Sequence, residues 1–530
     1  MNQRQSPNDQ DILLDQILQN PYDLEARRVY ADMLSERGDP KGEFILRQFD
    51  MEESAPWSPA FVDAKLESEN LFQRHENEWE SHFRKFLKQV FPADERLTRI
   101  NPSLQYLPNI AFRFRFGFID HFELNYGELK QLSKVKLVAP IRMVKLKASF
   151  VDESLVSNAL TELASIRHID IEVGRASNDK VEQIIHALDL PELESLRLRK
   201  HSAVECLKQR IERTPFANLI SLDLGGNRIS AADIKSLDKA RCFENLEHLR
   251  LIDNPIGNGG AKYLAKKRNL SSLKSLDIKM TNIDDKGLGF FASQDMPNLT
   301  KLGIGWWFGT NPTDIGIRKL LDRGRLSNLT ELDLTGWEMP KQVVQTIASA
   351  PELGNLKVLR LGNTKINDQT ADILASSEHL TELDLLDLSA AKISDDGIKT
   401  LLQSRTAIGL TSLNLSGVTS LGQTDLKGIF DLPTLASLRH LNLSKGSLSG
   451  EGLKTILHSE ALCDLQAIDL SSNEISSSHL KATWKEHKLE SLCQIRLETD
   501  GLNKSQLNKL KKRYEGVFSS LPFIRGMVSS

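Results

Sequence analysis

The sequence predicts an α/β solenoid, with a parallel β-sheet on its concave side, helices on its convex side and a small helical domain ahead of it. Two observations predict this fold: a repeat of about 27 residues through most of the chain, and a switch within each repeat from strand-like to helix-like spacing. The length of 530 residues agrees, because a single globular core usually stops growing at about 250–300 residues.

Each repeat opens with apolar residues at relative positions 1, 4 and 6, and often another at position 11, as in LISLDLGGNRIS from Leu219 to Ser230. Positions 4 and 6 enclose a polar residue, which predicts a short strand with one buried face. The second half has helical spacing and often starts with acidic residues, such as Asp395 and Asp396, that can cap free N–H groups. One repeat cannot bury its own apolar face, so the repeats must stack.

The ninth position keeps its register through about thirteen regular units. It falls at Gly174, His201, Asn227, Asn254, Thr281, Trp307, Trp337, Thr364, Ala391, Val418, Gly446, Asn473 and Asp500. Two weaker units precede them, near Phe122 and Val144, so the predicted solenoid covers residues 111–503.

This LxxLxLxxNxI pattern, with a helix in each unit, resembles the ribonuclease-inhibitor-like leucine-rich repeats over roughly residues 115–503. In that family the Asn or Cys at the ninth position hydrogen-bonds the backbone of the turn. Here only Asn227, Asn254 and Asn473 keep Asn, so the other turns need a different solution.

The segments outside the repeats predict helices. Residues 1–50 form a helical domain in which Asn20-Pro21, Arg28–Asp32, Glu36–Pro40 and Glu43-Phe44 resemble the repeat-companion domain that precedes bacterial, notably planctomycete, leucine-rich repeats. That resemblance implies no known activity. Residues 51–110 predict a charged helix and a connector, and residues 504–530 a helical C-terminal cap and tail.

The composition argues against several classes of protein. Lys plus Arg (68) and Asp plus Glu (71) nearly balance, whereas nucleic-acid-binding proteins are usually basic. The N-terminus lacks the apolar core of a signal peptide, and an apolar run long enough to span a membrane is absent. The four cysteines have no metal-ligand spacing and suit a reducing compartment. We therefore expect a cytoplasmic monomer without cofactor, metal, nucleic acid or membrane contact.

No catalytic motif is evident: a nucleophile elbow, a phosphate loop and a dinucleotide fingerprint are all missing. A long solenoid without a chemical motif predicts a non-enzymatic protein-interaction scaffold or inhibitor. The alternative is a trans-acting regulator that activates a partner enzyme with a concave arginine, such as Arg197, Arg250 or Arg360.

Position 5 lies between the two buried strand residues and should point to the concave side. This column reads Asp170, Arg197, Asp223, Arg250, Asp277, Gly303, Asp333, Arg360, Asp387, Asn414, Asn442, Asp469 and Arg496. Neighbouring strands lie about 4.8 Å apart, so the alternating charges predict either an ion-pair ladder or a docking strip, and the two are compatible. We predict partner contacts at Arg250, Asp277, Asp333 and Arg360.

A dense aromatic cluster, Trp306-Trp307-Phe308, lies in the longest repeat between glycines. Insertions often lie on the binding face of a solenoid, and Trp is enriched at interface hot spots. A docking site is therefore predicted at Trp306 and Phe308, with Lys301, Glu331 and Thr335 beside them. The alternative is packing, in which Trp307 and Trp337 stack and fill the space of absent asparagines.

Overall fold

The computed structural model describes residues 9–54, much of 60–81, 111–115, 118–125, 136, 141–148, 166–173, 192–199 and most of 218–496. Within the last range the gaps are 240, 242, 306–311, 323–325, 423–425, 476–477, 480–487, 490 and 493. The chain divides into two compact units. Unit 1 comprises Met1–Pro56 with Ala60–Asn254, and unit 2 comprises Trp57–Pro59 with Pro255–Ser530.

The N-terminal region is helical, as predicted. It contains α1 (Asp9–Gln19), α2 (Leu24–Glu36) and α3 (Pro40–Glu53). The side chains of Asp23 and Asp39 accept hydrogen bonds from free N–H groups at the starts of α2 and α3, as N-caps do. These helices share a core of their own. It consists of Ile17, Ala26, Tyr30, Ala31, Leu34, Phe44, Ile45 and Phe49, with Leu71, Phe72 and Trp79 packed against it.

Unit 1 also contains the first strands of the sheet, in chain order. They are β1 (Ala111–Arg115), β2 (Phe118–Asn125), β3 (Met143–Ala148), β4 (His168–Val173), β5 (Ser195–Arg199), β6 (Ser221–Asp223) and β7 (His248–Arg250), with helix α9 (Ala231–Lys239) between the last two. From β2 to β7 each strand pairs in parallel with the next, as the repeat predicts. The β1–β2 pair is antiparallel, and the repeat pattern did not predict it.

Tyr22 joins the helical region to the strands of unit 1. In later repeats the backbone N–H at position 2 donates directly to the position-2 carbonyl of the preceding repeat, as the Glu194 N–H does to the Arg167 carbonyl (2.8 Å). Between Arg142 and Arg167 the Tyr22 hydroxyl takes this place. It donates to the Arg142 carbonyl (2.8 Å) and accepts from the Arg167 N–H (2.8 Å). The Arg167 guanidinium lies 4.3 Å from the centre of the Tyr22 ring. One side chain thus replaces an inter-repeat hydrogen bond.

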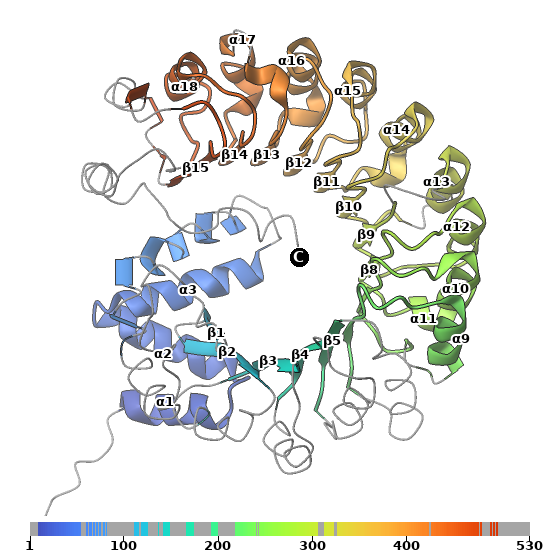
Figure 1. Ribbon diagram of the computed structural model, residues 1–530. Helices are drawn as coiled ribbons and strands as arrows, with labels where there is room; N and C mark the ends of the chain where they lie inside the picture. The colour runs from blue at the N-terminus through green and yellow to red at the C-terminus, as the bar shows by residue number, and fades with distance from the viewer. Residues whose placement is uncertain are drawn as a thin grey trace, which may run out of the picture. The chain divides into compact units, whose positions relative to one another are not determined.

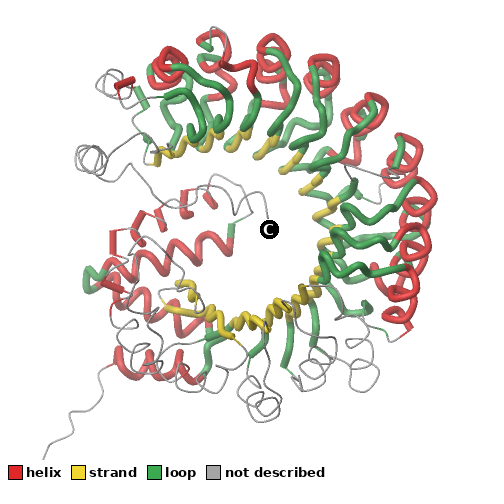
Figure 2. The backbone as a smooth tube through the Cα atoms, in the orientation of Figure 1, coloured by secondary structure: helices red, strands yellow, loops and turns green. Residues whose placement is uncertain are grey.

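Unit 2 confirms the repeat architecture, with strands on the inner side of its curve and helices on the outer side (Figures 1 and 2). The strands are β8 (Ser275–Asp277), β9 (Lys301–Gly303), β10 (Glu331–Asp333), β11 (Val358–Arg360), β12 (Leu385–Asp387), β13 (Ser412–Asn414), β14 (His440–Asn442), β15 (Ala467–Asp469) and β16 (Gln494–Arg496). Each pairs in parallel with the next.

The α-helices of unit 2 alternate with these strands. They are α10 (Gly257–Leu264), α11 (Lys267–Leu270), α12 (Asp285–Phe291), α13 (Asp314–Leu321), α14 (Lys341–Ala348), α15 (Asp368–Ala375), α16 (Asp395–Gln403), α17 (Lys427–Phe430) and α18 (Gly450–Leu457). Short 3-10 helices lie at η6 (Pro351–Leu353), η7 (Arg405–Ala407), η8 (Thr419–Gly422) and η9 (Pro433–Leu435).

The apolar positions of the repeat form the core between sheet and helices. Leu219, Leu222, Leu224 and Ile229, at positions 1, 4, 6 and 11 of one unit, are all buried. Burying one such side chain contributes about 1.5–3 kcal/mol, so the stacked column is the main source of stability.

Short polar side chains hold the first turn of several helices. Asp284 accepts a hydrogen bond from the Lys286 N–H and caps α12, as the acidic pattern suggested. At α16 the cap is Ser394, and the predicted Asp395 and Asp396 lie inside the first turn. Asp285, on α12, accepts a hydrogen bond from the Gly316 N–H of α13 (3.0 Å), so its carboxylate also links two neighbouring repeats.

The ninth position stabilises the turns in three ways. The Asn254 side chain donates to the carbonyls of Leu224 and Leu251 and accepts from two backbone N–H groups of the preceding repeat. Asn473 makes the equivalent four hydrogen bonds to its own repeat and the repeat before it. Thr281 and Thr364 each donate a hydroxyl to the carbonyl three residues earlier. Trp337 is fully buried, and a Cβ on Gly305 would come within 2.6 Å of it. The indole therefore packs against the preceding turn, and Trp307, its partner in the predicted stack, lies outside the described residues.

Candidate interaction surface

The inner face of the sheet carries a hydrogen bond that explains the acidic residues at position 5. From Asp223 to Asp469, every repeat that has Asp or Asn at position 5 forms the same contact. The side-chain oxygen accepts a hydrogen bond from the backbone N–H two residues later, at distances from 2.8 to 3.2 Å. The acceptors are Asp223, Asp277, Asp333, Asp387, Asn414, Asn442 and Asp469. Such Asx turns satisfy a backbone donor where the strand ends. The alternation of charge predicted a ladder but did not reveal this second role.

The predicted ion-pair ladder is present in unit 1. Arg197 lies between two carboxylates, at 3.9 Å from Asp170 and 2.5 Å from Asp223. Arg250 approaches Asp223 from the other side at 3.2 Å. Asp223 thus pairs with two guanidinium groups on neighbouring strands.

In unit 2 the ladder is interrupted at Gly303, which has no side chain. The Lys279 ammonium reaches across β9 and pairs with Asp333, which lies two repeats further along the chain. A Cβ on Gly303 would lie 2.8 Å from the Asp277 carboxylate and 3.4 Å from the Lys279 side chain. Burial alone would raise the pKa of Asp333, but the Lys279 ammonium and the Thr335 N–H outweigh burial and lower that pKa. Asp333 is therefore a largely but not fully buried anion that Lys279 holds in place.

Glu331 connects the predicted residues of the neighbouring strands. Its carboxylate lies 3.2 Å from the Lys301 ammonium and 3.2 Å from the Arg360 guanidinium. The Lys301 side chain is 42% exposed, whereas Arg360 as a residue is only 4% exposed. We expected Arg360 on an accessible surface, and this expectation was wrong. Arg360 lies on the inner face but is covered, so it can hold Glu331 in position but offers little contact area.

Pairing also bears on the idea of a trans-acting arginine. Arg197, Arg250 and Arg360 each form at least one ion pair with a carboxylate on a neighbouring strand. Freeing a guanidinium from such a pair leaves the carboxylate uncompensated, which is costly where the pair is buried. The pairing therefore speaks against a regulator that inserts one of these arginines into a partner enzyme.

The predicted site residues are only partly brought together. Lys301, Glu331, Asp333 and Thr335 lie on β9, β10 and the turn after β10, next to Arg360 on β11. Asp277 lies on β8, directly beside Gly303 of β9. Arg250 belongs to unit 1. Trp306, Trp307 and Phe308 lie outside the described residues.

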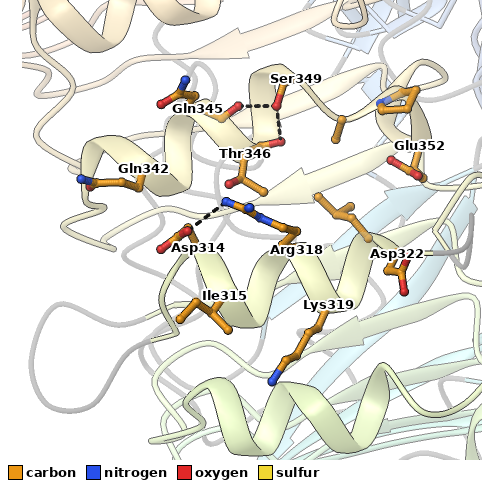
Figure 3. Close-up of a pocket in the computed structure, with 13 residues that line it drawn as sticks. Asp314, Ile315, Arg318, Lys319, Asp322, Gln342, Gln345, Thr346, Ser349 and Glu352 are labelled. Carbon is orange, nitrogen blue, oxygen red and sulfur yellow. Dashed lines mark hydrogen bonds and ion pairs between the residues drawn. The ribbon is translucent and has the colours of Figure 1, made fainter.

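The outer side of unit 2 has an open groove between α13 and α14, with a volume of about 890 Å³ (Figure 3). Ile315 on its rim is 56% exposed. Asp314 and Arg318 pair with each other at 3.1 Å across one turn of α13. The remaining lining is mixed in charge and polarity, and the groove holds no arrangement of groups that indicates a specific ligand.

The described part of the chain contains no cluster of His, Cys, Asp or Glu that could hold a metal ion. None of its helices is long and apolar enough to cross a membrane.

Asp387 provides a test of the Asx role. Burial raises the pKa of this carboxyl, so the folded state favours its protonated form and ionised Asp387 costs stability at neutral pH. The stability that the protonated carboxyl contributes is fully present below pH 3.8, its ordinary pKa, and is lost as the pH rises through the raised pKa of the folded state. Asp387→Asn keeps an acceptor for the Ser389 N–H, as Asn414 and Asn442 do. We expect its melting temperature at pH 7 to equal or exceed that of the unmodified chain.

Asp387→Ala is the matched variant, because it removes the acceptor as well as the charge. It should lose about 1–3 kcal/mol, the cost of an unsatisfied buried donor. Thermal unfolding at pH 7 and pH 4 distinguishes the two effects. If Asn were as damaging as Ala at pH 7, the charge rather than the Asx turn would be what the fold requires.

Comparison with known proteins agrees with this architecture. Residues 244–265, 269–292 and 434–457 match the family model described as "Leucine Rich repeat". Each matched segment contains one strand and the helix that follows it: β7 and α10, β8 and α12, and β14 and α18. No curated protein sequence matches the chain significantly.

Solved structures that match the chain include the crystal structure of the Rad7 and Elc1 complex in yeast. The identity is 15%, the match covers 70% of this chain and 89% of that chain, and the TM-score is 0.41. The matched segments and the regular strand–helix alternation show that this chain contains leucine-rich repeats.

Proposed function

We propose that this protein binds another protein on the inner face of β8–β10 and acts as a non-enzymatic scaffold or inhibitor. One observation carries the proposal: charged side chains of both signs lie partly exposed on this face, and each is held by a neighbour. Lys279 is fixed by Asp333, and Lys301 by Glu331. Ordering flexible side chains is one of the costs of association, so a surface that is already ordered favours binding.

The proposal extends to the rest of the chain. The aromatic residues Trp306 and Phe308 would supply the apolar centre that protein interfaces need, next to the charged strip. The helices before the repeats would be a companion domain of the bacterial type. The protein would act in the cytoplasm as a monomer, without nucleic acid, membrane or cofactor.

The experiment is affinity capture from a lysate of the native cells, with bound proteins identified and quantified by mass spectrometry. The inner-face variant combines Lys301→Ala with Thr335→Lys, which removes one exposed charge and adds another, and it keeps both the Asp333 acceptor and the backbone N–H of residue 335 that form the Asx turn. We expect at least one protein captured by the unmodified chain to fall about tenfold or more with this variant, as a loss of about 1.4 kcal/mol would produce.

Arg318→Ala is the matched control, because this side chain is 72% exposed on the outer helix α13 and pairs only locally with Asp314. Binding of the same protein should persist. Equal capture by all three chains would show that β8–β10 is not the docking surface.

A further inference from the structure

A second depression lies on the helical side of unit 2, among α10, α11 and α12 (Figure 1). Its volume is about 470 Å³, and three cations line it: Lys262, Lys266 and Arg268. Lys262 and Arg268 are exposed, and Lys266 is partly exposed. No carboxylate is among the described residues that line this depression. A chain with a formal net charge of -3 therefore carries a local basic surface here, which we call the basic pocket.

The cations of the basic pocket belong to a stretch of sequence without acidic residues. Residues 254–276 contain no Asp or Glu, but they contain Lys262, Lys266, Lys267, Arg268 and Lys274. The segments that follow the helices of other repeats differ, because many of them carry an acid. After α12, α14, α15 and α18 the acids are Asp295, Glu352, Glu378 and Glu460. The basic pocket is therefore a property of one repeat and does not follow from the repeat pattern.

The first turn of α11 also departs from the usual charge preference of helices. The helices α12, α13, α15 and α16 have Asp in their first turns, where the positive end of the helix dipole favours an anion. In contrast, α11 begins with Lys267 and Arg268 and has no acid in its first turn. Cations at this place do not stabilise the helix that carries them. Residues that break a local rule of this kind often do so for function.

The other polar groups of the basic pocket are already used within the fold. The backbone N–H groups of Ala265, Ser293 and Gln294 donate to carbonyls of preceding residues in α10 and α12. The Ser293 hydroxyl donates to the Phe290 carbonyl at 2.6 Å, and the Gln294 amide donates to that hydroxyl at 3.1 Å. A ligand in the basic pocket would therefore meet mainly the charged ends of the lysine and arginine side chains.

These features fit separate carboxylates on a flexible chain better than one compact phosphate. Compact phosphate sites use several free backbone N–H groups that point at one anion, and the N–H groups named above already have acceptors. Lysine ammonium groups are point charges on flexible stems, so they can pair with separate anions. Buried Ala265 and partly exposed Phe290 add apolar surface on which a non-polar side chain between the carboxylates can pack.

We propose that the basic pocket binds an acidic segment of a protein partner, in which Asp and Glu flank an apolar side chain. The carboxylates would pair with Lys262, Lys266 and Arg268, and the apolar side chain would contact Phe290. Complementary charge of this kind speeds the encounter and fixes the register of a complex. The site is separate from the proposed docking surface, because α10–α12 and the inner face of β8–β10 lie on opposite sides of the sheet (Figure 2).

The first experiment uses the full chain and a fluorescein-labelled peptide of sequence GDEDEFEDEDG, with binding measured by fluorescence anisotropy. The peptide should bind saturably, and added salt should weaken binding, since ions screen the attraction between exposed charges. The control peptide has Asn for each Asp and Gln for each Glu, and it should not bind. Equal affinity for the two peptides, or no binding of the acidic one, would overturn the proposal.

A double charge reversal locates the site. Lys262→Glu with Arg268→Glu should lower the affinity for the acidic peptide about tenfold or more, which corresponds to about 1.4 kcal/mol. The matched control combines Lys341→Glu with Lys399→Glu, which makes the same change in net charge at exposed positions on α14 and α16. Its affinity should remain nearly that of the unmodified chain. Equal losses in the two variants would mean that net charge attracts the peptide, and this would contradict the proposal.

Cross-linking of the unmodified chain covers the case in which the reversed variant does not fold. A carbodiimide joins a carboxylate of the bound peptide to a neighbouring lysine through an amide bond, and mass spectrometry identifies that lysine. Cross-links should form at Lys262 or Lys266 and should be absent from Lys341. Cross-links mainly at Lys301 would place the peptide on the inner face of the sheet and refute the proposal.

Competition identifies the chemistry of the ligand. Inorganic phosphate and a single-stranded DNA oligomer are each added to the complex of the full chain with the acidic peptide. Both should displace the peptide only weakly. Displacement by phosphate at the concentration of the peptide would indicate a phosphate site, and tighter binding of the DNA would indicate a nucleic-acid surface. Either result would overturn the proposal of an acidic protein segment.

Discussion

Replacing Tyr22 by phenylalanine should lower the free energy of unfolding by about 2–4 kcal/mol, since it leaves a backbone donor and a backbone acceptor without a partner, each costing about 1–3 kcal/mol. The donor is the Arg167 N–H and the acceptor is the Arg142 carbonyl, both now bound by the Tyr22 hydroxyl. The phenyl ring would still occupy the space between them, so they could not close into the direct bond seen in later units. Burial raises the pKa of Tyr22 to about 12, so the hydroxyl remains protonated and donates throughout the neutral range.

Urea unfolding measures the loss, and amide hydrogen exchange locates it. Exchange of the Arg167 N–H should become faster, while the Glu194 N–H, which bonds directly to the Arg167 carbonyl, provides an internal control. Unchanged exchange at Arg167 would mean that Tyr22 does not complete the ladder between these repeats.

Asp223→Arg should destabilise the protein by about 2–3 kcal/mol, well above the 0.5 kcal/mol of an ordinary surface change. Asp223 now separates Arg197 and Arg250, so the reversal would place three guanidinium groups side by side. Like charges on neighbouring strands repel each other, and the Gly225 N–H would also lose its acceptor.

Asp223→Asn is the control, because it removes the charge but keeps the Asx turn. Its loss should be smaller than that of Asp223→Arg. Added salt should reduce the deficit of the Arg variant, since ions screen repulsion between partly exposed charges. A melting temperature of Asp223→Arg equal to that of the unmodified chain at low salt would refute the ladder.

The repeat architecture could be predicted because it depends on burial at regular intervals. Leu222 and Leu224 mark a strand through their spacing alone, and the same spacing predicts which residues share the inner face. The pairs of Arg197 with Asp170 and Asp223 followed from that register, since parallel strands place equal positions side by side.

Contacts that depend on side-chain length or on distant segments could not be predicted in the same way. The pair of Lys279 and Asp333 skips one strand, and it forms because Gly303 leaves room for the lysine chain. Tyr22 meets Arg167 only after the helical region has docked, and no pattern within the repeats signals it. The burial of Arg360 likewise does not follow from its position within the repeat.

The central claim is that the stacked repeats set which side chains of the inner face are accessible, and histidine carbethoxylation tests it most directly at position 3, where His248 is exposed and His440 is buried. Diethyl pyrocarbonate applied to the folded full chain, followed by mass spectrometry, compares His248 with His440 at equal positions of their units. The account predicts rapid modification of His248, which is exposed, and protection of His440, which is 1% exposed. Equal modification of the two histidines in the full chain would contradict it.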